Sequence, residues 1–294
     1  MTRKVAKEIE KFFLNVDKEY FENYKMELVK RALKEDRCDN DVTTEAIVPE
    51  TAVIKAEIIA KEEGVIVGLN IAELVFRELD KEIVFEKKVG EGERVRKGKV
   101  IAYLKGKAKA VLTGERTALN LVQRLSGIAT LTAEFVRLGK GIKILDTRKT
   151  IPGMRELEKY AVKLGGGCNH RFNLNDAVLI KDNHIAIAGS VKKAIRLAKK
   201  TGKKIEVEVK NLKEVREALA ERVNRILLDN MKISEIIKSI KLIRENGKAE
   251  IEVSGRVNLK TIKEIAGTGA DYASVGALTH SAKALDISLE VLTR

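Results

Sequence analysis

The stretch KLGGGCNHRFNLNDAVLIKDNH, residues 163–184, holds the features that decide the fold and the chemistry of this chain. It contains three consecutive glycines, the cations Arg171 and Lys181, and two of the chain's three histidines, His170 and His184. Its apolar run ends in Lys181 and has the length of a buried strand. A strand that ends in a cation beside a glycine-rich segment indicates a ligand-binding site at the end of that strand.

The same pattern recurs along the chain from about residue 113 onward. Short apolar runs are separated, in most cases, by amphipathic segments of helical length. Alternating strands and helices at this spacing predict a parallel sheet, and their unbroken repetition predicts an α/β barrel. The expected strands are residues 142–146, 177–181, 205–209, 225–229, 251–255 and 272–276, and the expected helices are residues 190–201, 212–222, 232–246 and 258–267.

The first part of the chain has a different pattern, in which two helical segments are followed by alternating strands. The sequence therefore predicts two domains, an N-terminal α/β domain of residues 1–112 and a catalytic barrel of residues 113–294. A helix at the C-terminus of the barrel can pack back on the first domain. In the N-terminal domain we expect helices at residues 5–15 and 19–35 and strands within residues 53–68, 82–89 and 99–106.

The composition excludes several classes of protein. A hydrophobic content of 44% over 294 residues is enough for a sizeable core, so the chain is not disordered as a whole. No apolar run approaches the roughly 18 to 20 residues of a membrane span, and the N-terminus has the pattern of a charged amphipathic helix, so we expect a cytoplasmic protein without a membrane partner. Cys38 and Cys168 are too few and too far apart for a disulfide framework or a zinc site.

The chain has a strong excess of basic residues, with 57 Lys and Arg against 43 Asp and Glu and a formal net charge of +14. This excess fits either a nucleic acid or a small polyanionic substrate. Most basic residues alternate with acids along the expected helices, as on solvated helix faces, and aromatic residues for base stacking make up only 4% of the chain. We therefore expect no nucleic-acid partner.

Polar or glycine residues follow each expected strand of the barrel. In a β/α barrel the carboxyl ends of the strands converge on one face, where active sites are found. The separate strand ends should therefore build a single site. In chain order they are Asp146-Thr147-Arg148-Lys149, Lys181, Glu208, Asp229, Ser254-Gly255 and Gly276.

The residue types at these ends indicate the chemistry of the ligand. Cations recognise carboxylates and phosphates, whereas Glu208 and Asp229 suit a divalent metal or a developing positive charge. The glycine-containing segments 254–257 and 274–281 follow the last two strands, where barrels often hold a phosphate on backbone N–H groups. The expected cations are Arg148, Lys149, His170, Arg171 and Lys181.

The helical segment 115–127 carries a polar stripe opposite an apolar face. Arg116, Asn120, Gln123 and Gly127 recur at helical spacing. A helix that needs only solvation would seldom place Asn, Gln and Gly along one line. We therefore expect this stripe to serve a second subunit.

Several blocks of the sequence, taken together, resemble those of one known enzyme family. The blocks are ERTALNLVQRLSGIAT, DTRKTIPGMRELEKYAVKLGGGCNHRFNLNDAVLIKDNHI, EVEVKNL, LLDNM, SGRVNL and SVGALTHS, in this order. They resemble the nicotinate-nucleotide pyrophosphorylase (carboxylating) family, also called quinolinate phosphoribosyltransferase. The resemblance extends from residue 35 to the C-terminus.

The resemblance implies a reaction, a fold and an assembly. In the reaction, quinolinate and 5-phosphoribosyl-1-pyrophosphate give nicotinate mononucleotide, pyrophosphate and carbon dioxide, with Mg²⁺, as a step of NAD biosynthesis. The fold is an N-terminal α/β sandwich followed by an open parallel α/β barrel of the type II phosphoribosyltransferase kind. The assembly is a homodimer with shared active sites, with a hexamer as the higher alternative.

The resemblance also assigns roles to individual residues. Lys149, Glu208 and Asp229 are implied to be catalytic, and the two acids are implied to hold Mg²⁺ directly or through water. Arg116 is implied to reach the quinolinate pocket of the partner subunit. The quinolinate site would comprise Arg116, Thr147, Arg148, Lys149, His170, Arg171 and Lys181, and the phosphoribosyl pyrophosphate site Lys149, Lys181, Glu208, Asp229, Ser254, Gly255, Gly276 and His280.

One departure and one alternative accompany the resemblance. Many family members have a second glycine after the Ser-Gly pair, whereas this chain has Arg256, which we expect to point outward. The alternative is a sister family associated with molybdenum transport, which shares several of the blocks and would use a different acceptor. Asn169 and the segment 180–184 match the quinolinate enzymes.

Overall fold

A computed structural model of the chain describes residues 8–10, 12–13 and 16–292, which form two compact units. Unit 1 comprises the described residues of Met1–Ala133, Ile151–Gly166 and Ala282–Arg294, and unit 2 comprises Glu134–Thr150 and Gly167–Ser281. The boundary expected after residue 112 falls inside helix α5 (Ala108–Leu138). The helix expected at residues 5–15 lies partly outside the described residues; residues 8–10 and 12–13 are helical.

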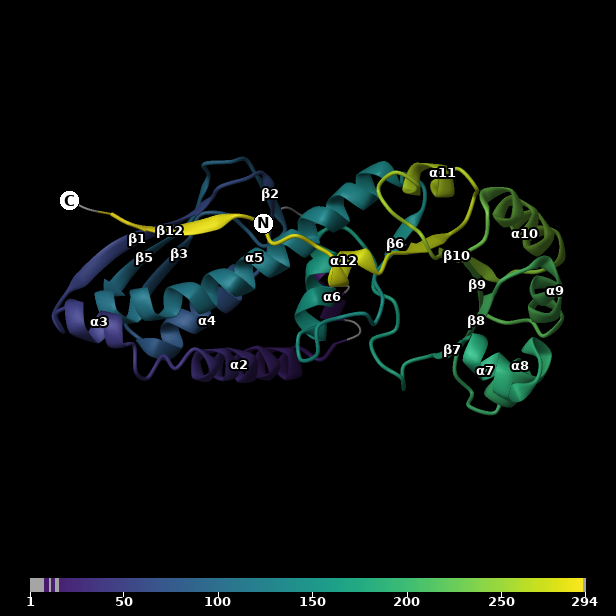
Figure 1. Cartoon of the computed structure of the whole chain (residues 1–294), viewed down its shortest axis with the longest axis horizontal. Helices are drawn as coiled ribbons and strands as arrows, with labels where there is room; N and C mark the ends of the chain where they lie inside the picture. Colours follow the sequence, from purple (N-terminus) through teal and green to yellow (C-terminus); the bar gives the residue numbers. More distant parts are fainter. Residues whose placement is uncertain (1–7, 11, 14–15, 293–294) are drawn as a thin grey trace. The chain divides into compact units, whose positions relative to one another are not determined.

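Unit 1 is built on a four-stranded antiparallel sheet in the order β12-β1-β5-β3. Helix α4 buries Ile71, Val75 and Phe76, and helix α2 packs on α4, so both helices lie on the same side of the sheet (Figure 1). The strands are β1 (Val53–Ala60), β3 (Val84–Lys87), β5 (Val100–Lys107) and β12 (Ile287–Val291), with a separate pair β2 (Gly64–Ile66) and β4 (Glu93–Val95); the other helices are α2 (Lys18–Glu35), α3 (Val42–Ile47), α4 (Leu69–Leu79) and α6 (Arg155–Leu164).

The C-terminal segment corrects one expectation, because it is a strand and not a helix. Strand β12 pairs antiparallel with β1, from Ala56 opposite Val291 to Ala60 opposite Ile287. Its sequence, ISLEV, is rich in β-branched residues and too short for a stable helix. The free edge of β1 supplies the hydrogen-bond partners that an isolated strand would lack.

Unit 2 is a six-stranded parallel sheet in the order β6-β11-β10-β9-β8-β7. Each strand lies at one of the predicted apolar runs, so the predicted parallel sheet is confirmed. Strands β6 and β7 form the two edges of this sheet, which makes the barrel open. The strands are β6 (Lys143–Leu145), β7 (Val178–Ile180), β8 (Ile205–Val209), β9 (Arg225–Asp229), β10 (Glu250–Ser254) and β11 (Tyr272–Ser274).

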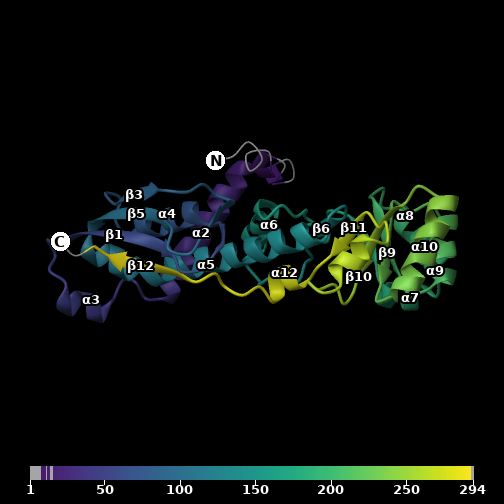
Figure 2. The same cartoon turned by 90° about the horizontal axis from the view of Figure 1, so that it is seen from above.

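The helices of unit 2 cover the outer face of its curved sheet, as Figures 1 and 2 show for α8, α9 and α10. Ser190 and Asn211 cap α8 and α9 by accepting hydrogen bonds from the backbone N–H groups of Lys193 and Glu214. No helix in the described ranges is long and apolar enough to cross a membrane. The helices are α7 (Asp182–Ala188), α8 (Val191–Lys199), α9 (Leu212–Ala220), α10 (Ile233–Asn246), α11 (Ile262–Ala266) and α12 (Ala277–His280).

The polar stripe on helix α5 has two different environments, and only one of them fits the expectation. Gln123 donates a hydrogen bond from Nε2 to the carbonyl of Ile287 at 2.7 Å. A Cβ on Gly127 would lie 2.0 Å from the carbonyl oxygen of Lys283, so only glycine fits there. These two residues accommodate the chain that leads to β12, so their place in the polar stripe has an explanation within one chain. Arg116 and Asn120 are exposed.

Candidate active site

A cavity of about 500 Å³ opens at the carboxyl ends of the strands of unit 2. It brings together most of the residues that the sequence analysis placed at strand ends, although they are up to 107 positions apart, from Thr147 to Ser254. The predicted residues that line it are Thr147, Arg148, Lys149, His170, Arg171, Lys181, Glu208, Asp229 and Ser254.

The cavity is also lined by residues that the sequence analysis missed. Several of them lie two positions before a residue that the sequence analysis did identify. Side chains two positions apart on a strand point to the same face of a sheet. Glu252 precedes Ser254 in this way, and Leu227 precedes Asp229. The period of two could therefore have identified this deeper layer. The missed lining residues are Leu179, Leu227, Asn230, Glu252 and Ser274.

One wall of the cavity is cationic. Arg148 and Arg171 each have a buried Nε that lacks a hydrogen-bond partner among the described residues. Burial and the charge of Arg148 lower the pKa of the Arg171 guanidinium. Two half-buried arginines that repel each other and retain a free, buried Nε donor are poised to accept an anion, and a carboxylate is the partner that arginine binds best.

The backbone around Lys149 is held from two sides. Its N–H donates to Thr147 Oγ1 at 3.0 Å, and its carbonyl accepts from Thr279 Oγ1 at 2.8 Å. A Cβ on Gly276 would lie 3.1 Å from His280 Nε2 and 3.2 Å from Lys149 Cδ. Gly276 and His280 therefore lie directly beside the Lys149 side chain, although they are not among the lining residues of the cavity.

A second wall of the cavity, formed by Glu208 and Asp229, is acidic. Burial and the nearby charge of Asp229 raise the pKa of the Glu208 carboxyl, while Lys181 acts against this effect. Two carboxylates that repel each other at the rim of a cavity form a set of oxygen donors that suits a hard divalent cation such as Mg²⁺. At the same rim, Lys210 pairs with Asp182 at 2.9 Å.

The loop after β10 has an unusual backbone. Gly255 has φ +83° and Arg256 has φ +54°, a left-handed conformation that a residue with a Cβ adopts only at a steric cost. The carbonyl of Arg256 accepts hydrogen bonds from Asn258 Nδ2 and Thr261 Oγ1, which hold this turn in place. The Arg256 side chain is exposed, as expected from the sequence. Gly255 does not line the cavity, and neither does Arg116, which lies on α5 in unit 1.

Beneath the cationic wall, His170 contacts a buried pair of acids. Its Nε2 lies 3.1 Å from Glu206 Oε2 and 3.7 Å from Glu252 Oε1. Arg225 completes the group, with its NH1 3.0 Å from Glu252 Oε2. His170 thus lines the cavity while its Nε2 is engaged by carboxylates below.

Opposing effects act on the protonation of His170. Burial opposes the charged ring, but the hydrogen bond to Glu206 and the charges of Glu252 and Glu206 outweigh burial and raise the pKa of His170. The backbone N–H of Arg171 also donates to His170 Nδ1 at 2.8 Å, which favours the neutral ring. The carboxylates prevail, because the hydrogen bond to Glu206 and the surrounding negative charge outweigh one amide dipole.

The same group of His170, Glu206 and Glu252 places three potential metal-ligand atoms within 4.8 Å of one another. Arg225 supplies the positive charge that a metal ion would otherwise bring, because its guanidinium contacts Glu252 and lies 3.8 Å from Glu206. We therefore interpret these residues as a charge-balanced network that supports the cavity from below.

Glu252→Gln should change how stability depends on pH. Burial and the charge of Glu206 raise the pKa of Glu252 to about 7 from the ordinary value of 4.5, although His170 and Arg225 lower it. The folded state therefore favours protonated Glu252, and this contribution to stability is complete below about pH 4.5 and is lost as the pH rises to about 7. In urea titrations, the wild type should lose about 1–3 kcal/mol more free energy of unfolding between pH 5 and 7.5 than the variant. An identical loss in both proteins would contradict this role.

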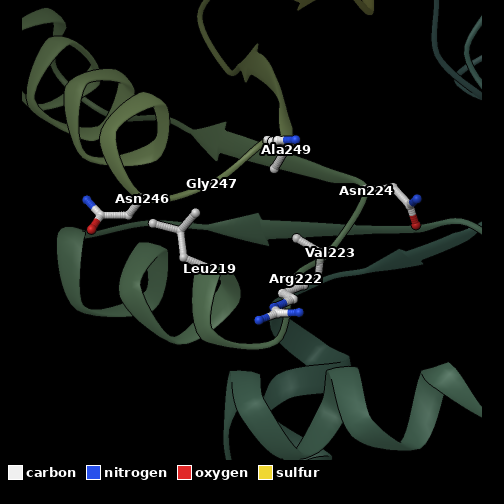
Figure 3. Close-up of a pocket in the computed structure, with 8 residues that line it drawn as sticks. Leu219, Arg222, Val223, Asn224, Asn246, Gly247 and Ala249 are labelled. Carbon is white, nitrogen blue, oxygen red and sulfur yellow. The ribbon is translucent and has the colours of Figure 1, made fainter.

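A second cavity of about 490 Å³ lies at the other end of the sheet, before strands β9 and β10 (Figure 3). Leu219, Arg222, Asn224 and Asn246 are among its lining residues, and no carboxylate lines it. The amino-terminal face of a β/α barrel contributes mainly to stability, whereas catalytic groups gather at the carboxyl-terminal face. The cavity at the carboxyl ends is therefore the candidate active site.

Comparisons with known proteins give consistent matches over most of the chain. The family description "Quinolinate phosphoribosyl transferase, C-terminal domain" matches residues 128–290, and the N-terminal domain of that family matches residues 41–126. The probable nicotinate-nucleotide pyrophosphorylase (carboxylating) of Methanocaldococcus jannaschii is 45% identical over 282 residues, covering 92% of this chain and 98% of the relative. The protein of that name from Bacillus subtilis is 46% identical over 264 residues, covering 87% and 90%.

Solved structures give the same result. The nicotinate-nucleotide pyrophosphorylase from Francisella tularensis superposes with a TM-score of 0.87 at 42% identity, covering 92% of this chain and 96% of that one. The enzyme of that name from Ehrlichia chaffeensis gives a TM-score of 0.86 at 41% identity, covering 90% and 98%. Similarity in sequence and in fold therefore extends across both units.

Proposed function

Because the chain belongs to the quinolinate phosphoribosyltransferase family, it transfers phosphoribosyl from 5-phosphoribosyl-1-pyrophosphate to quinolinate with decarboxylation, and we propose that the cavity at the carboxyl ends of β6–β11 is its active site. The products are nicotinate mononucleotide, pyrophosphate and carbon dioxide, and the reaction is a step of NAD biosynthesis. The names of the matching families and relatives favour this reaction over that of the sister family associated with molybdenum transport.

One observation carries the assignment of the quinolinate site. Arg148 and Arg171 bring two half-buried guanidinium groups into one wall, each with a buried Nε that lacks a partner among the described residues. Quinolinate has two adjacent carboxylates, which would supply the missing acceptors and neutralise the repulsion between the arginines. Lys181, Thr147 and His170 extend the same wall and would complete the pocket for the pyridine ring.

The acidic wall would act on the phosphoribosyl donor. As pyrophosphate leaves, the ribosyl carbon develops positive charge, and Glu208 and Asp229, which line the cavity, would stabilise it. These two acids would also hold Mg²⁺, directly or through water, and the bound ion would neutralise charge on the leaving pyrophosphate. Lys149 lines the same cavity and would contact both the acceptor and the donor phosphates. Ser254, Gly255, Gly276 and His280 would hold the 5-phosphate.

Decarboxylation follows from the charge created in the first step. When the pyridine nitrogen bonds to the ribosyl carbon, the ring becomes cationic. The bond from ring carbon 2 to its carboxylate then breaks, carbon dioxide leaves, and the electron pair that stays on the ring is stabilised by the adjacent positive nitrogen before a proton replaces it. The protein's part is to hold the reactants in register and to keep the retained carboxylate paired with cations.

The assembly is part of the same proposal. A homodimer in which Arg116 reaches the quinolinate pocket of the partner subunit would complete each cationic wall. Arg116 and its helical neighbour Asn120 are exposed, whereas Gln123 and Gly127 are occupied within their own chain. The hexamer and the cytoplasmic location stay predictions.

Asp229→Asn tests the assignment of the acids. The substitution keeps size and hydrogen bonding but removes the negative charge, so kcat should fall by about 100-fold or more while the KM for quinolinate changes little. Release of carbon dioxide and formation of nicotinate mononucleotide can be followed together at saturating Mg²⁺. If only the KM for quinolinate rises, Asp229 belongs to the acceptor pocket and the proposed division of the site is wrong.

A further inference from the structure

Asn230 connects the acidic wall to the loop that follows β10. It comes directly after Asp229, the last residue of β9, and lines the cavity. Its side-chain Nδ2 donates to Asp229 Oδ2 at 3.0 Å, and its backbone N–H donates to the carbonyl of Ser254 at 3.0 Å. One residue thus joins the last residue of β9 to the last residue of β10.

The same side chain lies flat against Gly255. A Cβ at Gly255 would lie 2.3 Å from Asn230 Oδ1 and 2.9 Å from the Asn230 backbone nitrogen. The amide therefore fills the space that any other residue at position 255 would need. Contact with Gly255 on one side and with Asp229 on the other leaves the amide little rotational freedom.

The backbone of Asn230 makes this arrangement attainable. Asn230 has φ +54°, the left-handed conformation, which asparagine tolerates better than most residues with a Cβ. This conformation turns the chain sharply at the end of β9, so that the side chain folds back toward its own neighbour. A residue in an ordinary strand conformation would point its side chain to the face opposite that of Asp229.

We propose that Asn230 is a positioning residue, which fixes the orientation of the Asp229 carboxylate and ties it to the Ser254-Gly255 loop. This inference rests on the proposed roles of Asp229 and of that loop in binding the donor. With Oδ2 held by the amide, the other carboxylate oxygen keeps one direction toward the cavity. A preorganised carboxylate needs no reorganisation when Mg²⁺ and the ribosyl group arrive.

Two substitutions at position 230 distinguish the contribution of the side-chain amide from that of the left-handed backbone conformation. Asn230→Gly keeps access to the left-handed conformation and removes the amide, whereas Asn230→Ala removes both. Arg222→Gly is the matched control, because Arg222 has φ +53° and lies before the amino end of the same strand, away from the cavity. All three variants are compared with the wild type and with Asp229→Asn.

The measurements are kcat, the KM for quinolinate, the melting temperature, and the Kd for 5-phosphoribosyl-1-pyrophosphate by calorimetry with and without Mg²⁺ and without quinolinate. We expect Asn230→Gly to lower kcat about tenfold, to weaken donor binding in Mg²⁺ about tenfold, and to leave the KM for quinolinate within about twofold. Asn230→Ala should show the same losses and a lower melting temperature. Arg222→Gly should match the wild type in kcat and Kd.

Two results would overturn the inference, and both are distinct from failure of the proposed function. If Asn230→Gly has the kcat and donor Kd of the wild type while Asn230→Ala is impaired in both, Asn230 is needed only for the left-handed backbone turn. If both variants match the wild type while Asp229→Asn is inactive, the acid acts without help from Asn230. If Asp229→Asn itself keeps full activity and donor affinity, the assignment of Asp229 is wrong.

Discussion

Nicotinate should be a very poor acceptor for this enzyme, with kcat/KM at least about a hundredfold below that of quinolinate. Nicotinate lacks the 2-carboxylate, so it would leave one of the half-buried guanidinium groups of Arg148 and Arg171 without a counter-charge. Leaving a buried charge unpaired costs about 3–5 kcal/mol, and the lower figure, which suits these half-buried groups, corresponds to a factor of about 150. A site built around two carboxylates therefore rejects a substrate that has only one.

The measurement compares initial rates with the two acceptors at saturating donor and Mg²⁺. Formation of nicotinate mononucleotide is the shared readout, because only quinolinate releases carbon dioxide. Phthalate, which keeps both carboxylates and lacks the ring nitrogen, serves as the control: it should inhibit competitively against quinolinate without being consumed. Equal turnover of nicotinate and quinolinate would show that Arg148 and Arg171 do not bind two carboxylates.

The arrangement of the cavity was predictable because unit 2 repeats one simple rule. Each of its strands is a short apolar run, and each run ends where the polarity changes, as at Lys181 and Asp229. Parallel strands bring such ends to one face whatever their separation in the chain. The period of two then indicates which side chains of each strand face the cavity. The location of the cavity could therefore be predicted without knowledge of side-chain contacts.

The buried network under His170 was not predictable from strand ends alone. Glu206 and Glu252 lie inside apolar runs. From the sequence alone, an acid at such a position is expected to be exposed on the polar face of a strand. Their burial depends on Arg225, whose guanidinium balances them from the strand between, and such pairing across strands requires the sheet order. The pattern along one strand cannot show which charged side chains on three neighbouring strands contact one another.

The strand conformation of β12 and the intrachain contacts of helix α5 could not be predicted for a related reason. ISLEV is compatible with more than one conformation, and the free edge of β1, more than two hundred residues earlier, decides in favour of a strand. The same crossing chain occupies Gln123 and Gly127, so part of the polar stripe on α5 has an internal explanation. The stripe alone could not distinguish contact with a partner subunit from contact with a distant part of the same chain.

Arg116→Ala and Lys149→Ala should each be nearly inactive alone and should restore activity to each other when their subunits are exchanged. Arg116 is exposed on α5, whereas Lys149 lines the cavity of its own subunit. If Arg116 acts in the partner's pocket, a mixed dimer has one site with both residues intact and one site that lacks both. Random exchange at equal concentrations makes half of the dimers mixed, so activity should return to about a quarter of the wild-type value.

The experiment depends on demonstrated exchange, which mass spectrometry of differently labelled subunits can measure in the same mixture. Arg137→Ala is the matched control, because Arg137 is also an exposed arginine on α5; this variant should be active alone. An Arg116 that only forms a surface ion pair would contribute at most about 1 kcal/mol, and Arg116→Ala would then keep most of its activity. An Arg116 that serves its own subunit would give an inactive variant whose activity does not return on exchange, because every mixed dimer would then have one defect in each site.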